Sequence, residues 1–120
     1  MAQQSKVRFT TATTEELIRE MIAVVAREVE PEAIILFGSR VTGDAYPDSD
    51  VDLLVIEVAP FGPDRDRRRE MIRIWYALAE FAVAKDILVY SHEEVERWRE
   101  ARNHVIGRAL REGRLLYGTL

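Results

Sequence analysis

Two short apolar runs, joined by a polar segment rich in turn-forming residues, constrain the fold of this 120-residue chain more than any other feature. The runs are Ile34–Phe37 and Leu53–Ile56, and each has the length of a buried strand and is too short for a helix. The joining segment begins with Gly38-Ser39 and ends with Asp50-Val51-Asp52. The sequence therefore predicts a glycine turn where one strand ends and two aspartates where the next begins.

The two aspartates are expected to act together. Side chains alternate along a strand, so Asp50 and Asp52, two positions apart, leave the same face. A helical turn starting at Ser39 would leave backbone N–H groups free to bind an anion such as phosphate. An anion cradle beside paired carboxylates indicates metal-assisted chemistry on a nucleoside triphosphate.

Simpler interpretations of the aspartates remain open at this point. Aspartate is common in turns, so the pair could be structural. The spacing of Asp48, Asp50 and Asp52 also matches the opening of an EF-hand calcium loop. That loop needs Gly at its sixth position and Glu at its twelfth, where this chain has Leu53 and Ala59. Calcium-loop geometry is therefore excluded.

The glycines do not form a known nucleotide loop by themselves. Gly38 and Gly43 have the spacing of a P-loop, but Asp44 follows where that loop needs Lys. The three-glycine dinucleotide fingerprint is also missing. The joint pattern of glycine turn and paired carboxylates is much more specific than either part.

That joint pattern resembles the nucleotidyltransferase superfamily that includes polymerase beta. Its signature is Gly-Ser, then Asp-x-Asp, then a third Asp on a later strand, here Gly38-Ser39, Asp50-Val51-Asp52 and Asp86. The chain is similar above all to the minimal nucleotidyltransferases of bacteria and archaea, which also end in a stretch like Glu112–Gly118. The resemblance spans about Thr14 to Gly118.

The resemblance implies a fold and a site. The fold would be α/β (α+β), a small mixed sheet with helices packed against it, over residues 13–120 after a flexible segment 1–12. Asp50, Asp52 and Asp86 would hold two Mg²⁺ ions and carry catalysis. Gly38, Ser39 and Arg40 would bind the phosphates of the nucleotide, although Arg40 could equally be an ordinary surface arginine.

The resemblance also implies a biological role. Such enzymes transfer a nucleoside monophosphate, usually AMP from ATP, to a hydroxyl acceptor and release pyrophosphate. The usual acceptor is a partner protein, a helical HEPN toxin with RNase activity that the transferase neutralises as antitoxin. An alternative is a non-catalytic antitoxin that neutralises the toxin by contact. A third possibility makes this chain the RNase, because Arg99 and His104 have the HEPN spacing, but its strand-rich first half argues against a helical toxin.

Composition narrows the remaining classes. Apolar residues make up 48% and charged residues 32%, as in an ordinary globular domain, and there is no cysteine for disulfides or thiolate metal sites. No apolar run reaches the length of about 18 residues that spans a membrane, and no signal peptide is visible, so a cytoplasmic location is the default expectation. A net charge of −4 gives no strong sign of nucleic-acid binding. A homo-oligomer is compatible with the sequence.

Periodicity and capping residues predict the other elements. One helix should run from Thr14 to the break at Pro31, another from a cap at Asp64 to about Ala84 with Trp75 in the core, and a third from the capping box Ser91–Glu94, with a break near Asn103 and an end at Gly113. Strands are expected at Ala33–Phe37, Val51–Glu57, Asp86–Tyr90 and Leu115–Tyr117, with Val7–Thr10 as a further edge strand. His92 and His104 are expected to be exposed helical residues.

Overall fold

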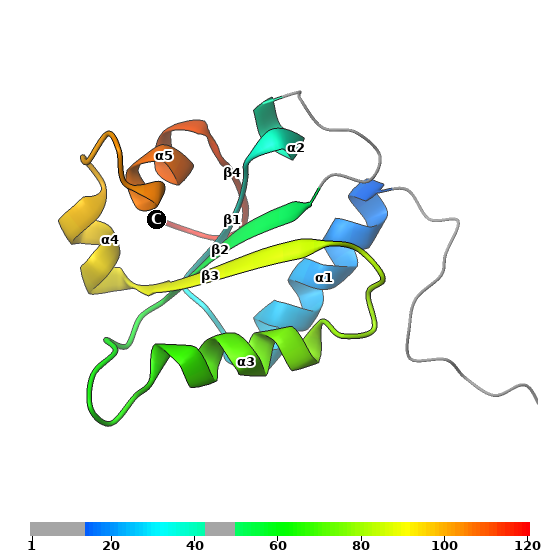
Figure 1. The fold of residues 1–120 in the computed structure, drawn as a ribbon, viewed down its shortest axis with the longest axis horizontal. Helices are drawn as coiled ribbons and strands as arrows, with labels where there is room; N and C mark the ends of the chain where they lie inside the picture. Colours follow the sequence, from blue (N-terminus) through cyan, green and yellow to red (C-terminus); the bar gives the residue numbers. More distant parts are fainter. Residues whose placement is uncertain (1–13, 43–49) are drawn as a thin grey trace, which may run out of the picture.

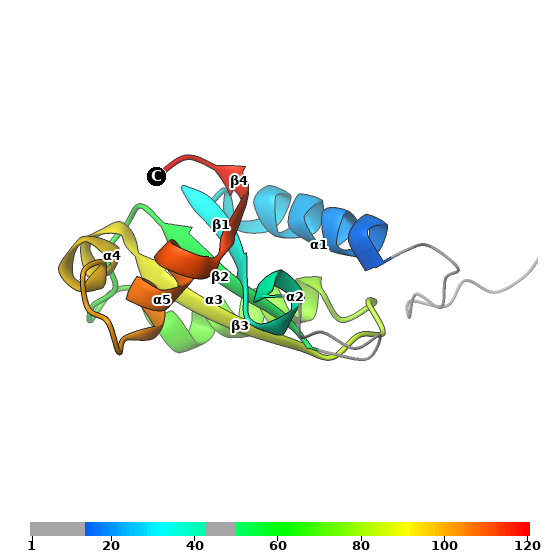
Figure 2. The same cartoon turned by 90° about the horizontal axis from the view of Figure 1, so that it is seen from above.

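A four-stranded sheet with helices on both faces forms the body of the protein (Figures 1 and 2). The structure is a computed structural model that describes residues 14–42 and 50–120. The expected flexible segment 1–12 and the edge strand Val7–Thr10 lie outside these residues, as does part of the polar joining segment. The elements are, in order, α1 Thr14–Val29, β1 Ala33–Phe37, α2 Ser39–Thr42, β2 Val51–Glu57, α3 Arg67–Ala77, β3 Lys85–Ser91, α4 His92–Trp98, α5 Val105–Glu112 and β4 Arg114–Gly118.

The sheet is mixed, as the resemblance implies. Its strand order is β3-β2-β1-β4. Strand β1 runs antiparallel to both β2 and β4, whereas β2 and β3 are parallel. Parallel neighbours need a long crossover connection, and α3 provides it. The predicted mixed sheet with packed helices is confirmed.

Each face of the sheet has its own apolar core. On one face, α1 and α3 cover a cluster that includes Ile34, Leu53 and Ile87. On the other face, α4 and α5 cover a smaller cluster that includes Ile35 and Leu54. Because both faces are buried, the central strands read in the sequence as continuous apolar runs rather than as alternating ones. Figure 1 shows the two helix layers on opposite sides of the strands.

Two predicted helix boundaries are confirmed. Helix α1 ends at Val29, and Glu30 takes a left-handed backbone conformation with φ of 47° just before Pro31. The predicted capping box opens α4, where the Ser91 hydroxyl accepts from the Glu94 N–H at 3.2 Å and the Glu94 carboxylate accepts from the Ser91 N–H at 2.9 Å. In the described part of the chain, no helix is both long and apolar enough to cross a membrane.

The prediction for α3 was wrong at both ends. Asp66, not Asp64, caps the helix by accepting from the Arg68 N–H at 2.9 Å, because paired backbone bonds between Gly62 and Arg65 hold Asp64 in a turn. The helix stops at Ala77 rather than near Ala84. The Lys85 ammonium donates to the carbonyls of Phe81 and Val83 at 3.0 and 3.2 Å, which helps to hold the non-helical segment between α3 and β3.

Two aromatic side chains also differ from the prediction. Trp75 is 40% exposed rather than in the core, and the Lys85 ammonium lies 5.3 Å from its ring centroid. His104 is not an exposed helical residue. It caps α5 through its Nδ1 atom, which accepts from the Ile106 N–H at 3.1 Å, and its ring stacks on Trp98 with centroids 4.5 Å apart. His92 is exposed in α4, as expected.

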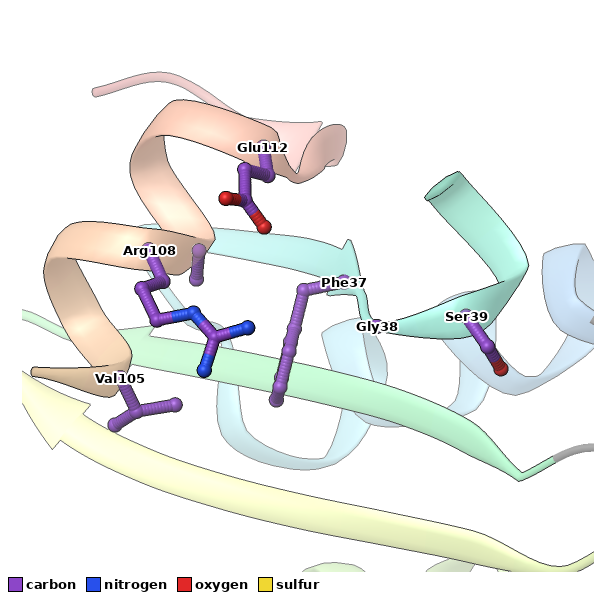
Figure 3. Close-up of a pocket in the computed structure, with 7 residues that line it drawn as sticks. Phe37, Gly38, Ser39, Val105, Arg108 and Glu112 are labelled. Carbon is purple, nitrogen blue, oxygen red and sulfur yellow. The ribbon is translucent and has the colours of Figure 1, made fainter. Parts of the chain in front are cut away.

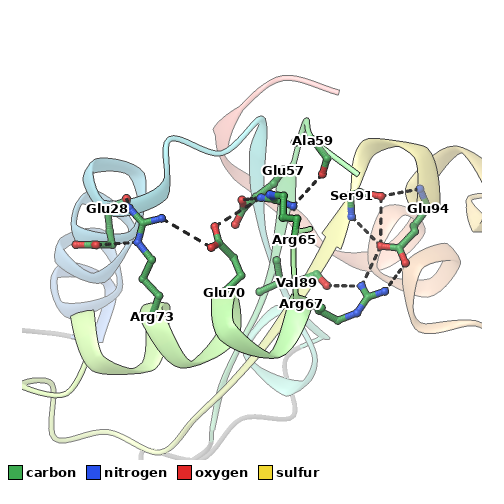
Figure 4. A network of polar contacts seen from close by, with 10 residues as sticks. All are labelled: Glu28, Glu57, Ala59, Arg65, Arg67, Glu70, Arg73, Val89, Ser91 and Glu94. Atoms are coloured by element: carbon green, nitrogen blue, oxygen red, sulfur yellow. Dashed lines mark hydrogen bonds and ion pairs between the residues drawn. The ribbon is translucent and has the colours of Figure 1, made fainter. Parts of the chain in front are cut away.

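A chain of ion pairs fastens the segment between β2 and α3 (Figure 4). Arg65 donates to the carboxyl group of the buried Glu57 and to the Ala59 carbonyl, the latter at 2.9 Å. Arg73 reaches from α3 to Glu28 of α1 at 3.0 Å. Arg67 pairs with Glu94 of α4 and donates to the Val89 carbonyl at 2.9 Å. These contacts tie α3 to both helix layers at the end of the sheet opposite the start of β2.

Candidate active site

A row of three side chains crosses the sheet where β1 ends and where β2 and β3 begin. Phe37 pairs with Asp52 in the antiparallel register, and Asp52 pairs with Asp86 in the parallel register. Strand alternation places all three on the face covered by α4 and α5, because Ile35, Leu54 and Leu88, two residues further along, pack in that core. The structure therefore brings Asp52 and Asp86 onto adjacent strands, side by side.

Asp50 completes the acidic group. It immediately precedes β2, is exposed, and has the same strand parity as Asp52. The charges of the other two aspartates act on Asp52. Burial raises the pKa of Asp52, and the negative charges of Asp86 and then Asp50 raise it further, while the positive charge of Arg40 opposes them. The ionised form of Asp52 is thus disfavoured until a positive charge arrives.

Gly38 lets the chain pass directly beside Asp52. Its φ is +79°, which L side chains rarely adopt, and a Cβ at this position would lie 2.2 Å from Asp52 Oδ2. The requirement for glycine is therefore steric as well as conformational. The Gly38 turn and the Asp52 carboxylate form one packed unit.

Ser39 begins α2, as predicted, but α2 is a single turn of four residues. A macrodipole needs many aligned peptides, so α2 contributes little of the field that the sequence argument invoked. The Val41 N–H already donates to the Gly38 carbonyl at 3.0 Å, so the anion-binding capacity of α2 rests on the Ser39 hydroxyl and the first backbone N–H groups of the turn. In Figure 3 this hydroxyl points away from α5, toward the end of the sheet where β2 begins.

The acidic group offers a suitable donor set for a hard divalent cation. Magnesium prefers oxygen ligands, and three carboxylates whose charges repel one another would be stabilised by it. The set is open, however. Among the described residues, no three His, Asp or Glu side chains lie close enough to form a finished metal-binding group. The residues therefore fit the ion by chemistry, and their side chains have to converge to enclose it.

The structure adds residues that the sequence argument missed. A pocket of about 340 Å³ lies beside Gly38 and Ser39, and α5 supplies Arg108 and Glu112 to its wall (Figure 3). Phe37 forms part of the same wall. No local motif marks Arg108, because its place here depends on how α5 packs on β1. Glu112 did appear in the C-terminal stretch, but only as part of a resemblance.

The residues of the possible RNase motif serve other purposes. Arg99 forms an ion pair with Glu96 at 2.6 Å, while His104 caps α5 and stacks on Trp98. Their separate partners give no support to a shared RNase site.

Comparison with known proteins identifies a family. The family described as "Polymerase beta, Nucleotidyltransferase" matches residues 19–119. No curated protein sequence is similar enough to count as a match.

Three solved structures share the fold. One is a candidate nucleotidyltransferase from Sulfolobus solfataricus, with a TM-score of 0.61 and 20% identity, covering 86% of this chain and 78% of that one. Another is a toxin–antitoxin with AMP-PNP, with a TM-score of 0.52 and 22% identity, covering 84% and 73%. A mutant of the toxin–antitoxin MntA-HpeT has a TM-score of 0.51 and 20% identity, with the same coverage.

Proposed function

The chain belongs to the polymerase beta nucleotidyltransferase family, and from this premise we propose that it transfers AMP from ATP to a hydroxyl group of a partner protein. The observation that carries the proposal is the raised pKa of Asp52. Its pKa is raised by burial and by the charges of Asp86 and Asp50, beside a glycine whose position admits no side chain. Groups perturbed by both burial and like charges often mark functional sites.

Asp50, Asp52 and Asp86 are the proposed ligands of two Mg²⁺ ions. Bound Mg²⁺ neutralises charge on the phosphates and supports displacement at the α-phosphorus. Asp52 and Asp86 have adjacent positions on parallel strands, which suits them to share one ligand group. Asp86 is also the proposed residue that helps take the proton from the acceptor hydroxyl.

Gly38, Ser39 and Arg40 are the proposed phosphate-binding residues. The Gly38 turn allows close approach of the nucleotide to the backbone, and Ser39 offers a hydroxyl and a backbone N–H group at the start of α2. The charge of Arg40 acts on Asp52, so it lies on the correct side of the site to balance phosphate charge. These groups hold the triphosphate while the acceptor oxygen bonds to the α-phosphorus and pyrophosphate leaves with the bridging oxygen.

A protein acceptor is supported by the surface of the molecule. Three large apolar side chains of α3 are exposed: Ile72 by 48%, Trp75 by 40% and Tyr76 by 79%. Exposed apolar groups that gather on one element are typical of interaction surfaces. The two toxin–antitoxin structures that share the fold support an antitoxin role here. The proposed partner is a HEPN-type toxin, as the resemblance of the sequence implies.

The test is to mix the protein with a purified HEPN partner and ATP labelled at either the α- or the γ-phosphate. Transfer of AMP puts the α label on the partner and leaves the γ label in pyrophosphate. Asp52→Asn should abolish labelling. Neutralisation of the toxin without labelling would support the contact-only antitoxin and reject the transferase proposal.

A further inference from the structure

The pocket beside Gly38 and Ser39 contains a positive charge that the proposed function has not used. Arg108 of α5 points into this pocket of about 340 Å³ (Figure 3). Within the described part of the chain, its guanidinium has no hydrogen-bond or ion-pair partner. The neighbouring Arg111, in contrast, donates to the Arg102 carbonyl at 3.0 Å, and Arg114 donates to Glu15 at 3.0 Å. Arg108 is therefore available for a ligand.

Helix α5 holds Arg108 in a fixed place. Ile106 and Ala109 are buried on either side of it. Gly107 packs so closely that a Cβ would lie 2.0 Å from the Ala101 carbonyl oxygen. The Arg108 N–H also donates to the His104 carbonyl at 3.1 Å, in the first turn of the helix. A side chain on such a scaffold can orient a ligand with little loss of backbone entropy.

The pocket is continuous with the proposed nucleotide site. Phe37, which forms one wall, is the cross-strand partner of Asp52. Gly38 and Ser39 line the same pocket. A triphosphate whose reacting phosphorus lies at the carboxylates, and which passes the Gly38–Ser39 backbone on the side that faces α5, would direct its outer phosphates toward Arg108.

We propose that Arg108 binds the outer phosphates of the nucleoside triphosphate and the pyrophosphate formed from them. This inference rests on the proposed function and adds to it a positioning residue from α5. In the reaction, the acceptor oxygen bonds to the α-phosphorus, and the bond between the α-phosphorus and the bridging oxygen breaks. Pyrophosphate leaves with that oxygen and its electron pair, and the hydroxyl proton passes to Asp86 and then to water. Arg108 recognises the charge of the departing group.

Glu112 should have the opposite effect to Arg108 on triphosphate affinity. It is one turn from Arg108 and lines the same pocket, so its negative charge should oppose the phosphates that Arg108 attracts. Removing each charge should therefore change triphosphate affinity in opposite directions. A purely structural role for either residue gives no such pair of effects.

The test is calorimetric titration of the protein with AMP-PNP in the presence of Mg²⁺, and separately with AMP, which has no outer phosphates. Arg108→Ala should weaken AMP-PNP binding about tenfold, the usual cost of one charge-assisted contact, and leave AMP binding unchanged. Arg108→Lys should recover part of the loss. Glu112→Gln should tighten AMP-PNP binding. The matched control is Arg102→Ala, an exposed arginine outside this pocket, which should have no effect.

Equal losses for AMP and AMP-PNP would overturn the inference, because Arg108 would then contact the nucleoside. Unchanged AMP-PNP affinity in Arg108→Ala, or weaker binding in Glu112→Gln, would overturn it as well. Thermal melts confirm that each variant is folded. If the wild-type protein binds AMP-PNP and only the Arg108 results fail, the proposed function survives. If the wild-type protein does not bind AMP-PNP, both fail.

Discussion

Gly38 connects the backbone to the chemistry of the site. Its positive φ and its contact with Asp52 are separate demands, and each excludes a side chain. The first concerns the stability of the turn, while the second concerns the placement of a carboxylate. A single substitution can therefore test both.

Gly38→Ala should lower the free energy of unfolding by about 1–2 kcal/mol, the cost of an L side chain at positive φ. The added Cβ should also push the Asp52 carboxylate aside, so binding of Mg²⁺ and AMP-PNP should fall more than stability does. Chemical denaturation and calorimetry measure the two effects. Gly62→Ala is the control, because a Cβ there meets nothing within 4 Å. A Gly38→Ala protein with wild-type stability and binding would contradict this account.

Asp86→Asn tests whether Asp86 belongs to the acidic group. Its negative charge is among the causes that raise the pKa of Asp52, so the variant should have a lower Asp52 pKa. A raised carboxylate pKa means that stability is lost as pH rises above the unfolded value, and Asp86→Asn should reduce this loss. Carboxyl NMR titration and thermal melts without metal measure the two results. If neither changes, Asp86 is only a residue at the start of a strand.

The boundaries of helices and strands could be predicted where they depend on residues close together in the sequence. The ends of β1 and β2 follow from apolar runs of strand length, and the start of α4 follows from the capping box Ser91–Glu94. These signals are local. The start of α3 depends on a backbone turn between Gly62 and Arg65, and its end depends on Phe81 entering the core. The local pattern therefore predicted a helix that begins too early and ends too late.

The site divides in the same way. The glycine turn and the Asp50–Asp52 pair lie in one segment and were visible in the sequence. The pairing of Phe37 with Asp52 depends on strand register, and the position of Arg108 depends on how α5 packs across β1. Neither of these two features can be recognised from the local sequence. The residues that the sequence missed are those that only tertiary structure brings to the site.

The segment between β2 and α3 contains a group that should respond to pH. Glu57 is only 4% exposed, and its burial, followed by its hydrogen bond with Glu70 and the charge of Glu70, raises its pKa from 4.5 to about 8 despite the nearby Arg65. The folded protein therefore keeps a proton that the unfolded chain releases. Stability should be full below about pH 4.5 and should fall as pH rises toward about 8.

Glu57→Gln keeps the size of the side chain and removes this titration. Between about pH 5 and about pH 9 the wild-type protein should lose at least about 1 kcal/mol relative to the variant. Denaturant melts across this range measure the difference. The control is Glu28→Gln, which alters an exposed member of the same ion-pair chain and should leave the pH dependence in place. Parallel pH profiles for wild type and Glu57→Gln would show that Glu57 is ionised throughout.

In the whole molecule, the proposed nucleotide site and the proposed partner-binding surface lie on different faces. One face of the sheet, at the end where β2 and β3 begin, gathers the acidic group, the Gly38 turn and the α5 pocket. The exposed apolar residues of α3 belong to the helix layer on the other face. A partner that contacts α3 thus leaves the nucleotide site uncovered, so that a hydroxyl group of the same partner can still enter it. This separation allows the two tasks to be tested independently.

Metal-dependent nucleotide binding tests the site without any knowledge of the acceptor. In calorimetric titrations with AMP-PNP, the wild-type protein should bind in the presence of Mg²⁺ and lose at least about tenfold in affinity when the metal is chelated, as expected if charge neutralisation supplies several kcal/mol. Asp52→Asn should lose the effect of Mg²⁺ while still unfolding in a single cooperative melt. Wild-type binding that is unchanged by chelation, or an Asp52→Asn protein that retains the full response to Mg²⁺, would contradict the assignment of this acidic group as the metal–nucleotide site.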